Sequence, residues 1–368
     1  MNIIIVLFAA AVLFRGTGCT KETGTPPENS LSVTDAVGRT VRVPGDVKRI
    51  VCRGPGVLRL IVYLDAAERV AAIESGFEQK TAAGRPYLLA HPELQKLPCV
   101  GTASPSPQPN PEALLTVSPD VVFIANVEPR TADNLQQRTG IPVVVLSYGA
   151  LGTFDNEYIF TSLRVAGAIL DKEKRAEEVI GFIQKFQDDL RKRTENIPDT
   201  DRPAVYVGGL GYKGTHGITS TECGFPLFEL VHARNAADSS GREGHMFVDR
   251  EKIIAWDPDV IFMDEGGLQH ARNDYRKNPD WYNLLRAVRN RRLYGLLPYN
   301  YYTTNIGTAL ADAFYIGKVI YPEQFGDVVP EQKADEIYTF LVGKPVYANM
   351  ADDWGGFKRV SLNMNGEQ

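Results

Sequence analysis

The sequence predicts an α/β fold made of two similar Rossmann-like lobes, each with a parallel sheet, joined by one long rigid helix. The first observation is a thirteen-residue pattern that occurs twice. The stretch EALLTVSPDVVFI opens at Glu112, and EKIIAWDPDVIFM opens at Glu251, an offset of 139 residues (251 − 112). The second observation is a long amphipathic helical pattern between the two copies. Together they indicate two related units with a ligand cleft between them.

Each copy of the pattern predicts a short helix followed by a buried strand. Pro119 and Pro258 cannot continue a helix, and they push the preceding residue towards extended geometry. The runs VVFIA and VIFM that follow are uniformly apolar. A strand with one solvated face would alternate, so these strands belong to a parallel sheet covered on both faces.

Length and composition fit a globular protein of two domains. The chain has 368 residues, 43% of them hydrophobic and 23% charged. Its net charge of −5 shows no basic excess, which argues against nucleic acid as a partner. No internal stretch is long and apolar enough to span a bilayer.

The N-terminus is typical of a secreted lipoprotein. The apolar run from Ile3 to Phe14 has the length of a secretion-signal core, and small residues precede Cys19 as in a bacterial lipobox. We therefore expect a signal peptide over residues 1–18, lipidation of Cys19 and a flexible tether over residues 19–32. Gly16 departs from the lipobox pattern and the signal lacks a basic start, so a plain cleaved signal and an uncleaved or wrongly assigned start remain alternatives.

The first lobe is expected over residues 33–158. It opens with a small hairpin, VTDAVGRTVRV, and continues with a short strand, RIVC, that ends at Cys52. A turn and a helical pattern from Val57 follow. Further strands are predicted at LPCVG, in the first copy of the repeat, and at GIPVVVL.

The connecting segment is expected over residues 159–198. Its helical pattern from Glu173 to Glu195 is the longest in the chain, and four apolar residues fall on one stripe of it: Val179, Ile183, Phe186 and Leu190. At about 1.5 Å per residue, such a helix would reach roughly 35 Å, the width of a small domain. One stiff helix of this length permits limited hinge motion.

The second lobe, expected over residues 199–342, repeats the order of the first. Strands are predicted at AVYV, in the second copy of the repeat and at RLYGLL. Helices are expected near Pro226 to His232, from about Gly307 to Ile320, and near Ala334 to Leu341. Residues 343–368 are expected to form a frayed tail.

Candidate ligand-binding residues follow the carboxyl ends of these strands, because ligands of open parallel sheets bind there. Phenol rings offer a flat apolar face and a polar tip, and a guanidinium group suits anions. Ordinary packing of the tyrosines and a solvated surface position for the arginine are the alternative interpretations. The candidates are Arg53, Tyr148, Tyr212, His216, Glu265, Tyr299, Tyr301 and Tyr302.

The sequence offers no catalytic constellation. The stretch GLGYKG at Gly209 matches a dinucleotide fingerprint in spacing, but no helix follows it directly and no acidic residue stands at the expected distance. The histidines are too scattered to form a metal site by themselves. His216 or His245 could still provide an axial ligand to a metal chelate. We therefore expect a protein that is not an enzyme and has no intrinsic cofactor.

Three cysteines remain after Cys19. The spacing of Cys52, Cys99 and Cys223 matches no zinc or iron–sulfur pattern. A disulfide between Cys52 and Cys99 and buried free thiols are both open, and at least one of the three has no partner within the chain.

Taken in order, these segments resemble the periplasmic binding proteins of ABC importers for iron–siderophore complexes, haem and vitamin B12. The resemblance runs from about Val33 to about Leu341 and is carried by VTDAVGRTVRVPGDVKRIV, NPEALLTVSPDVVFI, the bridging helix and REKIIAWDPDVIF. It implies two lobes, a rigid connecting helix and a shallow cleft. It also implies delivery of a small ligand to a membrane permease and its ATPase by a protein on the outer side of the cell membrane.

In that family one glutamate on each lobe docks with the permease, and the resemblance carries this role to Glu112 and Glu251. A first-turn glutamate also complements its helix dipole, which is the alternative interpretation. Arg53 and the tyrosines favour an anionic iron chelate as ligand. A corrinoid and haem remain alternatives, and an enzyme such as a metal chelatase is the alternative of another class.

Overall fold

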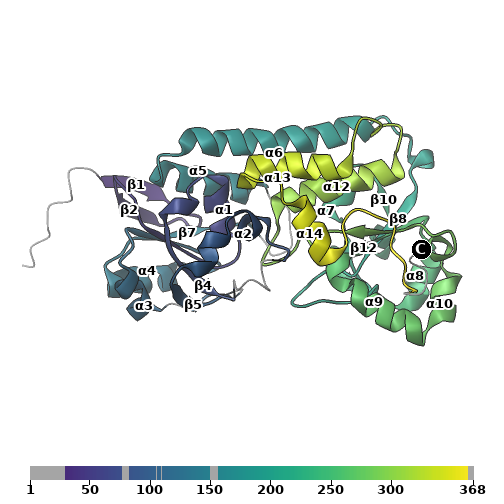
Figure 1. The fold of residues 1–368 in the computed structure, drawn as a ribbon, viewed down its shortest axis with the longest axis horizontal. Coiled ribbons are helices and arrows are strands. Elements are labelled where there is room, and N and C mark those ends of the chain that lie inside the picture. The colour runs from purple at the N-terminus through teal and green to yellow at the C-terminus, as the bar shows by residue number, and fades with distance from the viewer. Residues whose placement is uncertain (1–29, 77–82, 105, 109, 150–155, 364–368) are drawn as a thin grey trace, which may run out of the picture.

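The computed structural model describes residues 30–76, 83–104, 106–108, 110–149 and 156–363. Cys19 and the predicted signal and tether, apart from its last residues, lie outside this part of the chain. The described residues form two α/β lobes side by side along the long axis, under a layer of helices that spans both (Figure 1). The prediction of two lobes with parallel sheets is therefore confirmed.

The first lobe contains a five-stranded sheet in the order β5-β4-β3-β6-β7, in which every pair is parallel. A separate hairpin stands before it, as predicted. The strands of the sheet are β3 (Ile50–Arg53), β4 (Val70–Ser75), β5 (Cys99–Thr102), β6 (Val121–Ala125) and β7 (Val143–Leu146), and those of the hairpin are β1 (Ser30–Thr34) and β2 (Thr40–Pro44).

Alternate side chains of each strand in this lobe enter two different cores. Val121 and Phe123 of β6 pack on one face, and Val122 and Ile124 pack on the other, all four with no exposed surface. Both faces are covered by helices, which is why these strands carry no polar side. The helices of this lobe are α1 (Val57–Tyr63), α2 (Pro86–Ala90), α3 (Pro111–Val117), α4 (Pro129–Thr139) and α5 (Asn156–Ile169).

The second lobe contains a four-stranded parallel sheet in the order β10-β8-β12-β13 and a two-stranded antiparallel sheet that the sequence did not predict. The strands of the parallel sheet are β8 (Ala204–Gly208), β10 (Arg234–Asn235), β12 (Val260–Asp264) and β13 (Leu293–Leu296), and those of the antiparallel sheet are β9 (Ser220–Cys223) and β11 (Gly244–Phe247). The helices packed around them are α7 (Pro226–Glu229), α8 (Arg250–Trp256), α9 (Glu265–Lys277), α10 (Pro279–Leu284) and α11 (Arg286–Arg289).

The repeat in the sequence is also a repeat in the structure. The bounds of α8 and β12 are those of α3 and β6 shifted by the same 139 residues. Both helices end on a left-handed residue directly before the proline, Ser118 with φ 49° and Asp257 with φ 34°. A left-handed residue at this position turns the chain back so that the following strand can enter the sheet.

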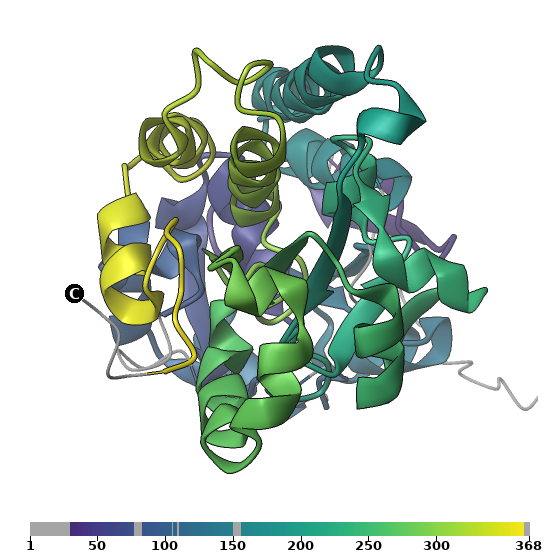
Figure 2. The same cartoon turned by 90° about the vertical axis from the view of Figure 1, so that its right-hand side faces the viewer.

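The lobes are connected by α6 (Glu173–Thr194), as the amphipathic pattern predicted. The four residues of its predicted stripe are buried, and its 22 residues give a length of about 33 Å. Two further helices, α12 (Ile306–Ile320) and α13 (Pro330–Val342), complete the layer, and Figure 2 shows the layer nearly end-on. Because α13 also contacts α1 and α2 of the first lobe, the bridge is a helical layer rather than a single helix.

The C-terminal segment does not fray as expected through its described part. It forms α14 (Tyr347–Trp354) and then follows the edge of the second sheet. The amide of Gly295 donates to the carbonyl of Lys358, and that of Val360 donates to Leu293. This pairing covers one edge of β13 and holds the segment in place.

The three described cysteines are free thiols. Cys52 on β3 and Cys99 on β5 are separated by β4, and neighbouring strands lie about 4.8 Å apart. Their separation of roughly 10 Å exceeds what a disulfide spans. The possible bridge between them is therefore excluded, and Cys99 is exposed rather than buried.

Candidate functional site

Residues 299–305 follow β13 and lie against the first lobe at the junction between the lobes. The guanidinium of Arg59, on α1 of the first lobe, donates to the carbonyls of Tyr301 and Tyr302 at 3.3 Å, to Thr303 at 3.2 Å and to Thr304. Arg59 has no exposed surface. We call residues 299–305 the junction segment.

Tyr302 forms a second contact between the lobes. Its hydroxyl donates to the Glu74 carboxylate at 2.8 Å, at the end of β4. Glu74 also accepts the Gly54 amide at 3.0 Å, and its other oxygen lies 3.5 Å from Nε of Arg53. Burial raises the pKa of Glu74, against the opposing effects of Tyr302, Gly54 and Arg53.

A third arginine faces the junction segment from the first lobe. The Arg85 guanidinium lies 5.1 Å from the ring centre of Tyr301 and 5.5 Å from that of Tyr302, within the range of cation–π attraction. Arg53, Arg59 and Arg85 are all buried, and Glu74 is the buried carboxylate that the described residues place beside Arg53. The first-lobe side of the junction therefore presents three buried guanidinium groups.

The second lobe presents an aromatic–imidazole patch formed by Tyr212, His216, His245 and Phe247. The Tyr212 and His245 rings stack with centres 4.2 Å apart, and Phe247 meets the edges of His216 and His245 at 4.8 and 5.1 Å. Tyr212 is 39% exposed and Phe247 is 53% exposed, although both are large apolar rings. Such exposure is typical of a surface that covers a ligand or partner.

Each histidine of this patch has a hydrogen-bond partner at Nε2. Nε2 of His216 donates to the Tyr212 carbonyl at 2.8 Å, and Nε2 of His245 lies 2.8 Å from the Ser220 hydroxyl. Burial, and then the charge of His216, lowers the pKa of His245. Burial therefore favours the neutral form of His245, in which one ring nitrogen keeps a lone pair.

Three other predicted site residues lie inside the lobes. Tyr148 donates to the Gly56 carbonyl at 3.1 Å and packs on Arg59. Tyr299 is buried with its ring edge against Phe225. Glu265 accepts the Gly356 amide at 3.0 Å, and burial raises its pKa to about 8. Tyr148 supports the junction through Arg59, whereas Glu265 faces the C-terminal segment.

The structure thus brings Arg53, Tyr148, Tyr301 and Tyr302 together at the junction, and Tyr212 with His216 in the patch. Sequence reasoning missed Arg59, Glu74, Arg85 and Phe247. Arg59 is the one charge in the apolar helix VLRLIVY, and Glu74 stands near the end of a strand. A lone charge in an apolar helix and an acidic residue near a strand end are both visible in the sequence, so both residues could have been named as candidates.

The described residues contain no group of three or more His, Cys, Asp or Glu side chains that could hold a metal ion. Nor does the described part of the chain contain a helix with the length and apolarity to cross a membrane.

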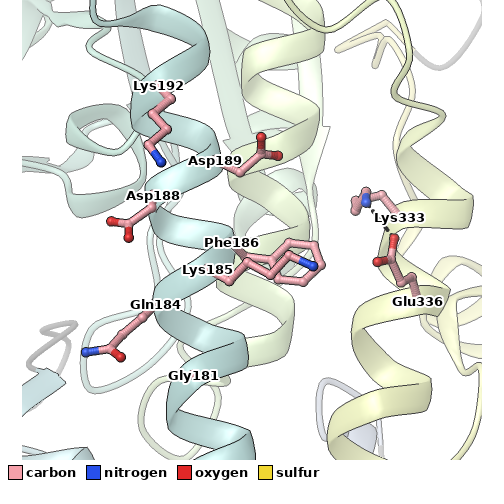
Figure 3. Close-up of a pocket in the computed structure, with 9 residues that line it drawn as sticks. All are labelled: Gly181, Gln184, Lys185, Phe186, Asp188, Asp189, Lys192, Lys333 and Glu336. Atoms are coloured by element: carbon pink, nitrogen blue, oxygen red, sulfur yellow. Dashed lines mark hydrogen bonds and ion pairs between the residues drawn. The ribbon is translucent and has the colours of Figure 1, made fainter.

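A surface groove of about 630 Å³ lies between α6 and α13, on the helical layer rather than at the strand ends (Figure 3). Three lysines and three carboxylates line it, and Lys333 pairs with Glu336 at 2.5 Å across one helical turn. These opposite charges compensate one another at the surface. The groove lining therefore has no excess of charge of either sign, and we place the candidate site at the junction.

The two candidate docking glutamates occupy equivalent places. Glu112 and Glu251 are exposed in the first turns of α3 and α8, which lie in different lobes and both below α6 in the view of Figure 1. Glu112 has an exposed ion pair with Arg138 at 3.3 Å. An exposed pair of this kind contributes little to stability, so both carboxylates are accessible to a partner.

Comparison with known proteins places these features in a wider group. Residues 61–299 match the family model described as "Periplasmic binding protein". The molybdate-binding protein MolA of Haemophilus influenzae is 23% identical over 331 residues, which cover 83% of this chain and 89% of MolA. The Fe(3+)-citrate-binding protein YfmC of Bacillus subtilis is 24% identical over 296 residues, covering 79% of this chain and 87% of YfmC.

Solved structures share the fold. A periplasmic solute binding protein from Veillonella parvula superposes with a TM-score of 0.71 at 22% identity, covering 89% of this chain and 97% of that protein. Identity at this level shows a common architecture and leaves the ligand open.

Proposed function

The chain belongs to the periplasmic binding protein family, and we propose that it captures an anionic iron chelate between its lobes and delivers it to an ABC importer. The observation that carries the choice of ligand is the group of buried arginines on the first-lobe side of the junction. Arg53 lies beside Glu74, and Arg85 lies beside the rings of Tyr301 and Tyr302. Buried positive charge favours an anion, because the anion offsets the cost of keeping that charge out of water.

The aromatic–imidazole patch supports a chelated metal as the cargo. The neutral imidazole that burial favours at His245 keeps one ring nitrogen with a lone pair, which can complete the coordination of an iron held by an organic chelator. In this proposal the metal is substrate, and the protein has neither an intrinsic cofactor nor an enzymatic activity. Haem and corrinoids are the further ligands that such a patch could accept.

A small oxyanion is the second candidate ligand. Guanidinium groups bind tetrahedral oxyanions in bidentate geometry, and Arg53 and Arg85 would require no metal for this. The similarity to a molybdate-binding protein favours the same class. In this case the aromatic–imidazole patch would lie outside the ligand contacts.

A thermal-shift screen tests the ligand. Ferric citrate, a ferric siderophore, molybdate, haemin, cobalamin and cobinamide are compared side by side on the same preparation. A ligand present at about 100 times its dissociation constant adds roughly 2.7 kcal/mol to the free energy of unfolding. We expect ferric citrate or the siderophore to raise the melting temperature most. A shift with molybdate alone supports the second candidate, and no shift with any of them contradicts the capture of a small ligand.

Substitution of one arginine tests the role of charge. Arg85→Gln should lower the affinity for ferric citrate by about tenfold, since a hydrogen bond to a charged group contributes about 1.5–3 kcal/mol. Arg164→Gln is the matched control, because Arg164 forms an exposed pair with Glu177 on the helical side. Equal affinities of the two variants would argue against an anion site at the junction.

Permease docking through Glu112 and Glu251 is proposed from the family resemblance and from their equivalent exposed positions. Charge reversal of both to lysine should abolish uptake by whole cells and leave ligand affinity unchanged. Glu177→Lys is the control, since Glu177 is also exposed in an ion pair, on α6. Normal uptake by the double variant would contradict the docking role.

Lipid anchoring through Cys19 is part of the same proposal. Cys19→Ala should release the protein from the membrane fraction into the soluble extract. Retention of the variant in the membrane fraction would show that Cys19 is not the anchor.

A further inference from the structure

Arg59 is a buried charge without an acidic partner. It lies in the middle of α1 among apolar residues, and its side chain is fully buried. Among the described residues, no carboxylate lies within ion-pair distance of its guanidinium, and the titratable groups near it are the neutral phenols of Tyr63, Tyr87 and Tyr148, whose pKa values burial raises. A buried charge is costly unless dipoles compensate it. Here the compensation comes from the carbonyls of residues 301–304 in the junction segment.

Those carbonyls can meet one cation because the segment has an unusual conformation. Tyr302 and Thr303 both have left-handed backbones, with φ 58° and φ 64°. This conformation costs about 1–2 kcal/mol for each residue other than glycine, and it is rarest for β-branched residues such as Thr303. Such a turn persists only where surrounding contacts impose it. Arg59 supplies four of those contacts from the opposite lobe.

The turn determines where two predicted ligand-binding tyrosines lie. With the backbone held by Arg59, the Tyr302 hydroxyl reaches Glu74 and the Tyr301 ring lies beside Arg85. Asn305 assists from the end of the segment, where its side chain donates to the Gly84 carbonyl at 3.1 Å. Without Arg59, the carbonyls of residues 302–304 would lose this donor, whereas that of Tyr301 would keep the Asn305 side chain at 3.2 Å. The turn would then relax towards a less strained backbone.

We propose that Arg59 is a positioning residue, which holds the junction segment in its strained turn and so places Tyr301 and Tyr302 for ligand capture. The effect of Arg59 on ligand binding rests on the proposed function, whereas its effect on the backbone of the junction segment does not. Arg59 does not need to touch the ligand. Its action passes from α1 of the first lobe, through the backbone of the second, to the two tyrosines.

Guanidinium rescue of Arg59→Ala tests this role. The variant should bind ferric citrate about tenfold more weakly, because the relaxed turn displaces Tyr301 and Tyr302, and each hydrogen bond lost with them contributes about 1 kcal/mol. Millimolar guanidinium, which fits the space left by the side chain, should restore most of the affinity. Arg59→Lys keeps the charge but lacks the planar set of donors, so it should be intermediate.

Arg175→Ala is the matched control. Arg175 also donates from a guanidinium to backbone carbonyls of different elements, at 2.9 Å to Tyr63 and also to Phe340, but it lies on α6 away from the junction segment. It should lower the melting temperature and leave the affinity of the folded protein unchanged, with no rescue by guanidinium. If Arg59→Ala behaves in the same way, Arg59 is only structural and the inference is wrong.

Hydrogen exchange provides a readout without ligand. The Asn305 amide donates to the Tyr299 carbonyl at 2.7 Å, which closes the junction segment. In Arg59→Ala this amide should exchange faster, and guanidinium should slow it again, while the strands keep their protection. Unchanged exchange at Asn305 contradicts the positioning role, and so does unfolding of both Arg59 variants in the presence of guanidinium. Failure of every anion to bind the unmodified protein would contradict the proposed function instead.

Discussion

The hydroxyl group of Tyr302 forms hydrogen bonds between the two lobes. It donates to Glu74 at 2.8 Å and accepts the Ser104 amide at 3.2 Å. Both partners belong to the first lobe, whereas Tyr302 follows the last strand of the second. The hydroxyl also stabilises the ionised form of Glu74, whose pKa burial raises.

Tyr302→Phe should therefore destabilise the protein by about 1–3 kcal/mol, because the Glu74 carboxylate stays buried with one donor fewer. Urea unfolding measures this loss. Tyr212→Phe is the control, since the Tyr212 ring is exposed and none of its described contacts uses the hydroxyl. Equal midpoints for both variants would show that the hydrogen bond to Glu74 contributes nothing measurable.

At the level of elements, the two copies of the helix–strand unit end their helices in the same way but hold the last residue differently. Ser118 is exposed, and its hydroxyl donates only to the Leu115 carbonyl of its own helix. Asp257 accepts the Arg286 amide at 2.9 Å and pairs with the Arg286 side chain. The Asp257 side chain therefore holds the end of α8 through a contact outside that helix, whereas the Ser118 side chain makes no such contact for α3 among the described residues.

Glycine substitution should separate these two cases. Ser118→Gly removes the cost of a left-handed backbone and should raise stability by about 0.5–1 kcal/mol. Asp257→Gly gains the same relief but loses both contacts to Arg286, so it should be neutral or destabilising. The urea midpoints of the two variants provide the comparison, and shifts of the same sign and size would refute this account.

Across the whole molecule, buried carboxyl groups gather in the second lobe. Burial raises the pKa of Asp264 to about 7 and those of Glu222 and Glu265 to about 8. On the helical layer, hydrogen bonding to Arg193 lowers the pKa of Asp327 to about 2. The two groups of acids therefore change the stability of the fold in opposite directions as the pH changes.

Folding should be most favourable near pH 4–5 and weaken towards pH 8. A carboxyl with a raised pKa in the folded state keeps a proton that the unfolded chain releases near pH 4, so its contribution falls between about pH 4 and pH 8. Asp327 acts in the opposite sense and loses its contribution below about pH 4. Melting temperatures from pH 3 to pH 9 measure this profile.

Glu265→Gln should flatten the fall between pH 5 and pH 8, because the amide carries no titrating proton. The exposed Glu177→Gln should leave the slope above pH 5 unchanged. A slope that is the same in Glu265→Gln and the unmodified protein would show that Glu265 does not contribute to it.

The sequence predicted best those helices and strands whose formation depends on residues close together in the chain. The stripe of α6, the prolines after α3 and α8 and the apolar runs of β6 and β12 each follow from short-range geometry and burial. The strand β4, VAAIES, was missed because two alanines and a glutamate weaken its apolar signal. The antiparallel sheet of β9 and β11 was missed because its strands are short and other elements separate them in the sequence.

The sequence by itself determined two parallel-sheet lobes, the long helix between them and the strand ends where a site could form, because hydrophobic period and proline placement act over a few residues. Only the tertiary structure decided which side chains meet at the junction. Arg59 and the carbonyl of Thr304 are 245 positions apart, and Tyr302 and Glu74 are 228 apart. No local pattern encodes such pairs, since they form only when the helical layer brings one lobe against the other.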